Sequence, residues 1–463
     1  MEVFLKKNID YKINKYKYTQ IDDKFLITTI NGGWALLTKE EFDLLRHEKV
    51  EKDPKLFVLL EAQGIIITEN NLDRVIEMFK KRNSFLFDAV KLHIITVTQR
   101  CNHRCVYCHA KSVPLTEKGY DMDEKTAKKT VDFIFQCPSK YLAIEFQGGE
   151  PLLNFSIIEY IVEYSKKLAQ EKNKIISFNI VSNFSLMDED ILQFLIKNNF
   201  NINTSLDGPK HIHNKNRVFT DGSSYDKVIH WIKVIKDEYK YPLSALPTIT
   251  KFSLPFHKEI IDEYRALGFS TIRIRQLNNA GFAKERWENI GYTPQEFIEF
   301  WKKSLDYIIE INLQGTKMIE EYTQIVLEKF VGKKYPNYTC WGSPCGAAIS
   351  QCGYNYNGDI YVCDEARSFD MFKIGHVNQS YNEVFQSATV ANIVNLTSNM
   401  LTQCLDCVWK PFCGPCMICT FGQQNTLMGN MKVDNECFIR RNIIETVIKK
   451  LMSKEREILL GWI

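Results

Sequence analysis

Cysteine is the residue type with the clearest potential for chemistry in this chain. The sequence of 463 residues contains fourteen cysteines, of which Cys101, Cys105 and Cys108 stand together and ten lie between Cys340 and Cys437. The N-terminal residues lack the apolar stretch of a signal peptide, so we expect a cytoplasmic protein. Structural disulfides seldom persist in that compartment. The cysteines are therefore interpreted as metal ligands at separate sites.

The three clustered cysteines have the spacing C-x3-C-x2-C in the segment Cys101-Asn-His-Arg-Cys105-Val-Tyr-Cys108. Three thiolates on one short loop can bind three irons of a four-iron cluster and leave the fourth iron open. An open iron needs a ligand from outside the protein, so such a cluster suits the binding of a small molecule. The alternative is a tetrahedral zinc site completed by His103 or His109.

The later cysteines form a second region with its own spacing. Cys345 and Cys363 flank a glycine in the pattern C-x12-G-x4-C, and a run from Cys404 to Cys419 has the pattern C-x2-C-x5-C-x2-C-x2-C. Cys437 follows as the last cysteine. Repeated C-x2-C pairs also occur in zinc knuckles, so zinc is the alternative to iron–sulfur clusters here.

The region from 91 to about 330 must position the first cysteine loop, and it alternates short apolar strands with amphipathic helices. Six strand–helix units predict an α/β fold, a parallel sheet curled as a partial (β/α)6 barrel with its chemistry at the carboxyl ends of the strands. The first cysteine loop directly follows the first strand. The predicted strands are 93–98, 142–146, 176–181, 202–206, 245–249 and 271–274, and the predicted helices are 123–136, 156–170, 189–197, 225–237 and 258–267.

Residues 1–85 form a smaller predicted unit. A hairpin over 24–37 turns at a glycine pair, and a capping box of Thr38 and Glu41 opens the first of two helices. A short strand over 65–67 completes a pattern that resembles a winged-helix fold. Charges in this unit are balanced, which disfavours DNA binding and favours a sheet edge that binds an extended peptide. A unit that only packs against the rest of the chain is the alternative.

Composition limits the partners of the whole chain. Hydrophobic residues make up 45% and charged residues 25% of the sequence, which is typical of a globular protein. The formal net charge of +3 is too small to indicate a nucleic acid or an anionic membrane as a partner. No apolar run approaches the length of a transmembrane helix.

Small and polar residues follow the ends of further predicted strands. A Gly-Gly-Glu turn follows the second strand, a Ser-Asn pair the third, and a Ser-Leu-Asp-Gly-Pro segment the fourth. With the cysteine loop, these motifs in order resemble those of the radical S-adenosylmethionine (SAM) superfamily. The residues that this resemblance identifies as cofactor-binding are Tyr107, Gln147, Gly148, Gly149, Glu150, Ser182, Asn183, Ser205, Asp207 and Arg217.

The resemblance implies how these residues serve the cofactor. The open iron of the cluster at Cys101, Cys105 and Cys108 is implied to bind the amino and carboxylate groups of SAM. Backbone groups of the Gly-Gly-Glu turn are implied to meet the SAM ammonium, and small residues permit that close approach. Ser205 and Arg217 are implied to hold the ribose and the carboxylate of SAM.

The C-terminal cysteines resemble the SPASM extension of radical SAM enzymes, which houses two auxiliary four-iron clusters. The sequence departs from that pattern at one place, where the expected cysteine would fall on Met417. Carried over, the resemblance implies one auxiliary cluster on the first set of ligands and another on a second set. The first set is Cys340, Cys345, Cys363 and Cys416, and the second set is Cys404, Cys407, Cys413 and Cys437.

Three cysteines remain outside these assignments. Cys352 competes with Cys340 as an auxiliary ligand, and Cys419 competes with Cys416. Cys137 precedes a proline at a predicted helix end and is predicted to be a buried apolar thiol.

Longer stretches of the chain, including 146–153, 204–209, 264–269 and 343–348, resemble the maturases of the His-Xaa-Ser peptide system. This resemblance implies a ribosomally made precursor peptide as substrate. The leader of that peptide would add as a strand to the edge of the N-terminal sheet. The resemblance also implies radical chemistry at an unactivated carbon.

We therefore predict hydrogen abstraction from a peptide followed by a crosslink, either a thioether or a carbon–carbon or carbon–oxygen macrocycle. Loss of one electron to an auxiliary cluster would complete the oxidation. The alternatives are a formylglycine-generating enzyme of the anaerobic sulfatase-maturing type and a peptide epimerase. From another class, a non-catalytic iron–sulfur electron carrier is disfavoured, because electron transfer needs no open cluster.

The predicted architecture has a leader-recognition domain at 1–85, a radical SAM barrel at 86–330 and a SPASM domain at 331–463. Its predicted cofactors are three [4Fe–4S] clusters and SAM. Besides the precursor peptide, we expect an external electron donor of the flavodoxin or ferredoxin type. The sequence identifies neither a general acid or base nor the bond that is made.

Overall fold

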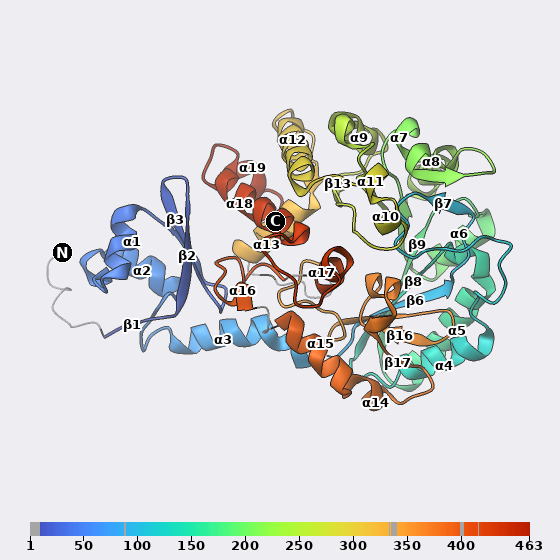
Figure 1. Ribbon diagram of the computed structural model, residues 1–463, viewed down its shortest axis with the longest axis horizontal. Helices are drawn as coiled ribbons and strands as arrows, with labels where there is room; N and C mark the ends of the chain where they lie inside the picture. The colour runs from blue at the N-terminus through green and yellow to red at the C-terminus, as the bar shows by residue number, and fades with distance from the viewer. Residues whose placement is uncertain (1–9, 88, 333, 335–339, 399–401, 415) are drawn as a thin grey trace.

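The computed structural model describes residues 10–87, 89–332, 334, 340–398, 402–414 and 416–463. The N-terminal unit lies at one end of the molecule and the central sheet with its helices at the other (Figure 1). Helices from the C-terminal half of the chain lie between them. Within the described ranges, none of the helices combines the length and apolar character needed to cross a membrane.

A three-stranded antiparallel sheet and three helices build the N-terminal unit. The predicted hairpin and capping box are confirmed: the Thr38 hydroxyl accepts from the Glu41 amide, and the Glu41 carboxylate accepts from the Thr38 amide. Strand β2 and helix α3 were not predicted. The elements are β1 (Lys12–Ile13), β2 (Tyr16–Ile21), β3 (Lys24–Thr29), β4 (Trp34–Leu37), α1 (Lys39–Arg46), α2 (Pro54–Ala62), β5 (Ile66–Ile67) and α3 (Leu72–Asn83).

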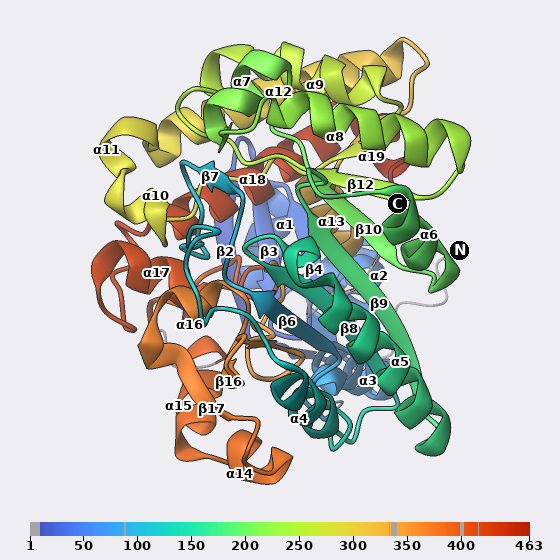
Figure 2. The ribbon, with the colours of Figure 1, turned by 90° about the vertical axis from the view of Figure 1, so that its right-hand side faces the viewer.

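The central sheet has eight strands in the order β12-β10-β9-β8-β6-β15-β16-β17, and all pairs from β12 to β15 are parallel. The first five predicted barrel strands are confirmed as members of this sheet. Helices α4, α5 and α6 cover its outer face (Figure 2). The strands are β6 (Leu92–Thr98), β8 (Tyr141–Gly148), β9 (Ile175–Ser182), β10 (Asn201–Ser205), β12 (Leu243–Leu246), β15 (Gln351–Tyr354), β16 (Asp359–Tyr361) and β17 (Lys373–His376).

The sixth predicted strand behaves differently from the other five. It forms only the short β13 (Thr271–Ile272), which pairs in parallel with β14 (Ile319–Glu320) outside the central sheet. A single bridge between Thr248 and Arg275 connects this region to the segment after β12. The expected barrel therefore continues past β12 only as irregular backbone.

The C-terminal region extends the sheet at its opposite edge, which was not predicted. Strand β15 pairs with β6, so the first barrel strand has neighbours on both sides. Buried side chains from both regions form one core, in which Phe133 of α4 lies against Tyr354 of β15. The segments that carry Cys345 and Cys363 are thus attached directly to the sheet that carries the first cysteine loop.

The remaining elements complete the barrel side and the C-terminal region. A second core cluster joins α9, α12, α13 and α18 around the buried Trp301. These elements are β7 (His103–Cys105), β11 (Arg217–Phe219), α4 (Glu124–Ile134), α5 (Phe155–Glu171), α6 (Glu189–Lys197), α7 (Lys210–Asn216), α8 (Ser224–Lys233), α9 (His257–Ala266), α10 (Phe282–Glu285), α11 (Trp287–Ile290), α12 (Pro294–Leu313), α13 (Glu321–Phe330), α14 (Tyr381–Phe385), α15 (Ala388–Ser398), α16 (Thr402–Leu405), α17 (Met417–Gln424), α18 (Asn435–Leu451) and α19 (Arg456–Leu460).

The N-terminal unit has its own hydrophobic core but also contacts the C-terminal region. The Thr28 hydroxyl donates to the Val408 carbonyl oxygen at 2.7 Å, and the Trp34 indole donates to the Phe330 carbonyl oxygen at 2.6 Å. Val408 lies within the segment that carries the second set of cysteines. The N-terminal sheet therefore supports one of the candidate metal sites.

Candidate functional site

The first cysteine loop begins three residues after β6 ends, at the carboxyl edge of the parallel sheet. Burial raises the pKa of the Cys101 thiol, and the nearby Cys105 raises it further. Burial likewise raises the pKa of Cys105, to about 12, with a further contribution from Cys108. The three thiols are therefore close enough to affect one another's pKa, as expected for ligands of one metal site. A bound cation would favour their ionised forms.

Two glycines bring the turn after β8 onto the backbone at the end of β6. The Gly149 amide donates to the Thr98 carbonyl oxygen at 2.8 Å, and the Glu150 amide donates to the Arg100 carbonyl oxygen at 2.9 Å. A Cβ atom on Gly149 would lie well inside van der Waals contact with the Arg100 carbonyl oxygen. Only glycine fits this close approach, which places the turn beside the cysteine loop.

The Glu150 side chain ties the ends of β8 and β9 together. Its Oε1 accepts from the Ser182 hydroxyl at 2.7 Å, and its Oε2 accepts from the Asn183 amide at 2.8 Å. Burial raises the pKa of Glu150 to about 7, against the effect of these hydrogen bonds. The carboxyl group therefore holds the two strand ends together. The Asn183 side chain points toward the cysteine loop, and its Nδ2 lies 2.9 Å from His103 Nδ1.

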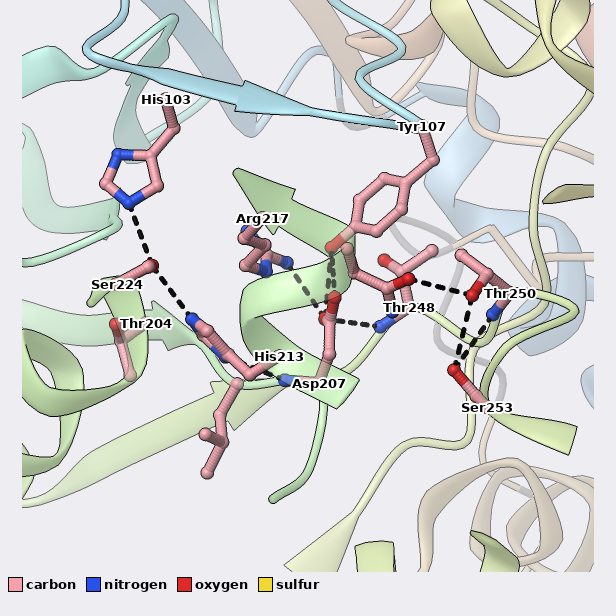
Figure 3. A network of polar contacts seen from close by, with 12 residues as sticks. His103, Tyr107, Thr204, Asp207, His213, Arg217, Ser224, Thr248, Thr250 and Ser253 are labelled. Atoms are coloured by element: carbon pink, nitrogen blue, oxygen red, sulfur yellow. Dashed lines mark hydrogen bonds and ion pairs between the residues drawn. The ribbon is translucent and has the colours of Figure 1, made fainter. Parts of the chain in front are cut away.

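Asp207, at the end of β10, is the centre of a second polar network (Figure 3). Its carboxylate accepts from the Tyr107 hydroxyl at 2.7 Å and from the Thr248 amide at 3.1 Å, and it pairs with Arg217 at 3.2 Å. Its side chain is completely buried. Since Tyr107 belongs to the cysteine loop, this network fixes the loop to two further strand ends.

Arg217 is also placed by backbone pairing, because β11 pairs with β7 and brings Arg217 opposite Cys105. The side chains of His103 and His213 meet the Ser224 hydroxyl from two sides, at 2.8 Å and 2.9 Å (Figure 3). Burial lowers the pKa of His103 to about 3 and that of His213 well below its usual range. Both imidazoles are therefore neutral at physiological pH, and His103 is engaged by the protein.

Two of the sequence-predicted residues lie near this network without joining it. Gln147, on β8, donates to the Glu145 carboxylate at 2.6 Å. Ser205 is half-buried at the last position of β10, two residues before Asp207. Both positions are at the same carboxyl edge as the cysteine loop. The predicted cofactor-binding residues thus come from neighbouring strand ends.

The residues at this edge fit the binding of a polar ligand beside an iron–sulfur cluster. Thr96 Oγ1 and Arg217 Nε are buried and have no hydrogen-bond partner within the part of the chain that is described. Buried polar atoms of this kind normally pair with a ligand or water. Three clustered thiols, a glycine turn and a fixed guanidinium are the groups that a cluster and SAM would need.

The first C-terminal set of cysteines lies where the chain enters and leaves the sheet extension. Cys340, Cys345 and Cys363 each interact electrostatically with Cys416. Ligand atoms of Cys416 and Cys419 and of the Glu365 carboxylate all lie within 4.8 Å of one another. Cys416 and Cys419, the two candidates for the fourth ligand, are therefore at one site. The Glu365 carboxylate lies there too, and the sequence analysis did not identify it as a candidate ligand.

The second C-terminal set lines a cavity of about 320 Å³ between α16 and α18. All four predicted cysteines border it, and four cationic side chains border it as well: Lys410, Lys432, Arg440 and Arg441. A cluster bound by four thiolates is negatively charged, and nearby cations offset that charge. The chemistry of this lining fits the predicted cluster. The four cysteines are Cys404, Cys407, Cys413 and Cys437.

Cys352 and Cys137 lie away from both sets. Cys352 is fully buried in β15, where its thiol donates to the Tyr354 hydroxyl oxygen at 3.2 Å. The Cys137 thiol donates to the Val90 carbonyl oxygen at 3.1 Å and is also buried. This arrangement favours Cys340 over Cys352 in the first set, and it agrees with the prediction of a buried apolar thiol at Cys137.

Sequence reasoning missed a polar contact between the two cysteine regions. His109, next to Cys108, lies 3.3 Å from the Asp364 carboxylate, which follows Cys363 in the chain. Burial opposes ionisation of Asp364, but the charge of Arg367 and the hydrogen bond with His109 outweigh it and hold the pKa of Asp364 well below the usual range. No local pattern predicts this contact, because its two residues are remote in sequence. The one available signal is that each of them directly follows a cysteine.

Comparison with known proteins identifies the family of this chain. Residues 95–251 match the family model described as the radical SAM superfamily. The chain belongs to the radical SAM superfamily. Membership in this superfamily implies SAM and a [4Fe–4S] cluster as cofactors, in agreement with the cysteine loop and the strand-end residues.

Two relatives with known activities match different shares of this radical SAM chain. The cysteine-type anaerobic sulfatase-maturating enzyme of Clostridium perfringens is 25% identical over 350 residues, which cover 73% of this chain and 92% of that protein. The radical SAM cyclopropyl synthase TigE of Paramaledivibacter caminithermalis is 23% identical over 466 residues. That match covers 97% of this chain and 90% of TigE.

Among solved structures, SuiB of Streptococcus suis bound to its precursor peptide SuiA has a TM-score of 0.56 and 16% sequence identity. The superposition covers 92% of this chain and all of that chain. The likeness shows a shared fold, an α/β radical SAM fold with a mostly parallel central sheet.

Proposed function

We propose that this radical SAM enzyme is a peptide maturase that installs a crosslink, a thioether or a carbon–carbon or carbon–oxygen macrocycle, in a ribosomally made precursor peptide. The observation that carries the proposal is the combination of an open cysteine loop with two further thiol sets and an N-terminal sheet. A crosslink that removes hydrogen from the peptide needs an electron acceptor. Two additional clusters, bound by the two C-terminal sets, would meet that need.

The N-terminal unit supports a peptide as the substrate. Strands β2 and β4 are the outer strands of its three-stranded sheet, and an extended leader can pair with such an edge. The matches to TigE and SuiB cover 97% and 92% of this chain, and the solved SuiB structure contains a precursor peptide. The sulfatase-maturating relative matches a smaller share, 73%.

The protein's own residues would act as a frame around the cofactor. Cys101, Cys105 and Cys108 would hold the cluster, and reductive cleavage of bound SAM would supply a 5′-deoxyadenosyl radical that abstracts a substrate hydrogen. Asp207 holds Tyr107 of the cysteine loop and Arg217, which lies opposite Cys105, in place. The buried strand ends exclude water, which protects a radical from side reactions.

A formylglycine-generating enzyme of the sulfatase-maturating type is the second candidate, because such enzymes match this chain at 25% identity. It would act on a cysteine or serine of a sulfatase peptide and would have no need of the N-terminal unit. Peptide epimerisation would leave the mass of the peptide unchanged. The product mass therefore separates epimerisation from the other two activities. Oxidation of a serine to formylglycine removes two hydrogen atoms, as a crosslink does, so labelling of the aldehyde with a hydrazide separates formylglycine from a crosslink.

The test is anaerobic reconstitution followed by incubation with SAM and dithionite. We expect 5′-deoxyadenosine to form, and we expect Cys105→Ala to abolish it while the absorbance of the C-terminal clusters persists. Cys137→Ala is the matched control, since this thiol lies outside all three sets, and it should leave cleavage unchanged. Absence of 5′-deoxyadenosine from the reconstituted wild-type protein would contradict the proposal.

The substrate is tested by co-expression with short peptides encoded beside the gene, followed by mass spectrometry. A loss of two hydrogen atoms is expected for a crosslink. An unchanged mass would indicate epimerisation instead, and formylglycine in a sulfatase-derived peptide would indicate the second candidate. Deleting residues 1–85 should suppress crosslinking of a leader-bearing peptide.

A further inference from the structure

One buried cation, Arg440 of α18, lies between the two C-terminal cysteine sets. The residue is only 2% exposed. Its Nε donates to Glu436 Oε1 at 2.6 Å, and its Nη1 donates to the Gly414 carbonyl oxygen at 2.6 Å. Gly414 directly follows Cys413 of the second set and precedes Cys416 of the first set by two residues. The guanidinium is thus anchored on the segment that joins the sets.

The guanidinium lies beside both sets: it stacks over Trp341, which directly follows Cys340 of the first set, and it lines the cavity of the second set. It interacts electrostatically with Cys345 and Cys416 in the first set and with Cys413 in the second. One fixed positive charge therefore faces two candidate cluster sites from a single side chain.

The surroundings hold this charge in place. The Arg440 guanidinium lies over the Trp341 ring at 5.2 Å from its centroid, and Glu436 Oε2 accepts from Gln276 Nε2 at 2.9 Å. Lys329, a second buried cation, donates to the carbonyl oxygens of Trp341 and Phe412. A guanidinium with a paired carboxylate, a ring and a backbone acceptor has little freedom to move.

We propose that Arg440 is a positioning residue that raises the reduction potentials of both auxiliary clusters by placing one buried positive charge between them. This inference rests on the proposed function, because it requires that both thiol sets hold clusters. Reduction adds negative charge to a cluster, and a nearby cation stabilises the reduced form. Because one cation is shared, its charge would shift both potentials in the same direction.

The test measures potentials rather than activity. Cys101, Cys105 and Cys108 are replaced by alanine, so that only the auxiliary clusters remain, and iron and sulfide are quantified. Midpoint potentials are then determined by redox titration with electron paramagnetic resonance detection. Arg440→Gln should shift both midpoints to more negative values, and Arg440→Lys, which keeps the charge, should leave both near those of the parent protein.

A control and an opposite variant make the test decisive. Arg456→Gln removes an exposed arginine from the neighbouring helix α19 and should change neither midpoint. Glu436→Gln removes the negative partner of Arg440 and should shift both midpoints to more positive values, and it provides the answer if Arg440→Gln does not fold.

Three results would overturn the proposal: a shift in only one midpoint with Arg440→Gln, an equal shift with Arg440→Lys, or no positive shift with Glu436→Gln. The first would show that the charge is not shared, and the second that packing rather than charge matters. Iron and sulfide too low for two clusters in the parent protein would instead contradict the proposed function.

Discussion

The strand-end site and the C-terminal cysteine region are built on different principles. At the strand ends, most functional residues follow neighbouring parallel strands of one sheet, and short polar contacts such as those of Asp207 lock the ends together. In the C-terminal region, the segments that carry the cysteines are held by side chains from elsewhere in the chain, including Thr28 of the N-terminal sheet and Arg440 of α18. The first site depends on the local order of one sheet. The second depends on contacts between remote parts of the chain.

Loss of the Asp207 carboxylate should cause the largest damage confined to the strand-end site. Asp207→Ala leaves the buried Arg217 without its partner, and breaking a buried ion pair costs about 3–5 kcal/mol. Chemical denaturation measures this loss, and SAM binding should fall with it. Asp226→Ala, which removes the exposed Lys210 ion pair, is the control and should cost much less, because water screens exposed ion pairs. Equal costs in both variants would contradict this account of the site.

A methyl group in the glycine turn should have the next largest effect. Gly149→Ala forces a Cβ atom against the Arg100 carbonyl oxygen, and overpacking of this kind costs about 1–3 kcal/mol. We expect the upper end of that range, because a backbone atom has to move. Gly461→Ala is the matched control, since its nearest non-neighbouring atom would be 3.3 Å away. Unchanged SAM binding in Gly149→Ala would show that the turn can relax.

The pairing of β6 with β15 should make the free energy of unfolding depend on pH. His93 of β6 lies 2.8 Å from the Tyr354 hydroxyl of β15, and burial lowers the pKa of His93 to about 3. Unfolding releases this histidine to an ordinary pKa near 6.5, so the unfolded chain binds an extra proton below that pH. The free energy of unfolding should therefore drop by about 2 kcal/mol from this group between pH 7 and pH 5.

The contribution of His93 is measured as the difference between variants. His93→Gln should lose this part of the pH dependence, and His230→Gln, which changes an exposed histidine, should keep it. Equal pH slopes in the two variants would exclude His93 as the cause.

The smallest effect is expected at the contact between the N-terminal unit and the second cysteine set. Thr28→Val removes the donor to the Val408 carbonyl oxygen and should cost about 1 kcal/mol. Because Val408 lies between Cys407 and Cys413, the variant should also release iron from the second set faster during chelation. Thr19→Val on the neighbouring strand is the control. Identical iron release in both variants would show that the sheet does not support the second set.

Much of the strand-end site could be predicted because its signals are local. Hydrophobic periodicity within short segments predicted five of the barrel strands. In the N-terminal unit, the spacing of Thr38 and Glu41 predicted the capping box in the same local way. Motifs that follow consecutive parallel strands come together at one edge without further information. The sixth strand failed as a sheet member because its pairing with β14 depends on a segment far along the chain.

The C-terminal region was predicted less completely because its structure depends on remote contacts. The choice between Cys340 and Cys352 follows from the pairing of β15 with β6, which no local pattern specifies. Glu436 and Arg440 have the spacing of an ordinary surface ion pair on a helix, yet both are buried. Their role becomes visible only when the loop at Gly414 packs against them.

The pairing of β15 with β6 also has a consequence for synthesis of the chain. Strand β6 is made early, but the strand that covers its outer edge follows only after residue 350. During translation, this edge of a buried apolar strand therefore stays open while most of the protein is being made. Open edges recruit other strands, and contacts between distant residues form slowly. We expect soluble yield to depend on slow translation or on chaperones, and truncation before β15 to give aggregates.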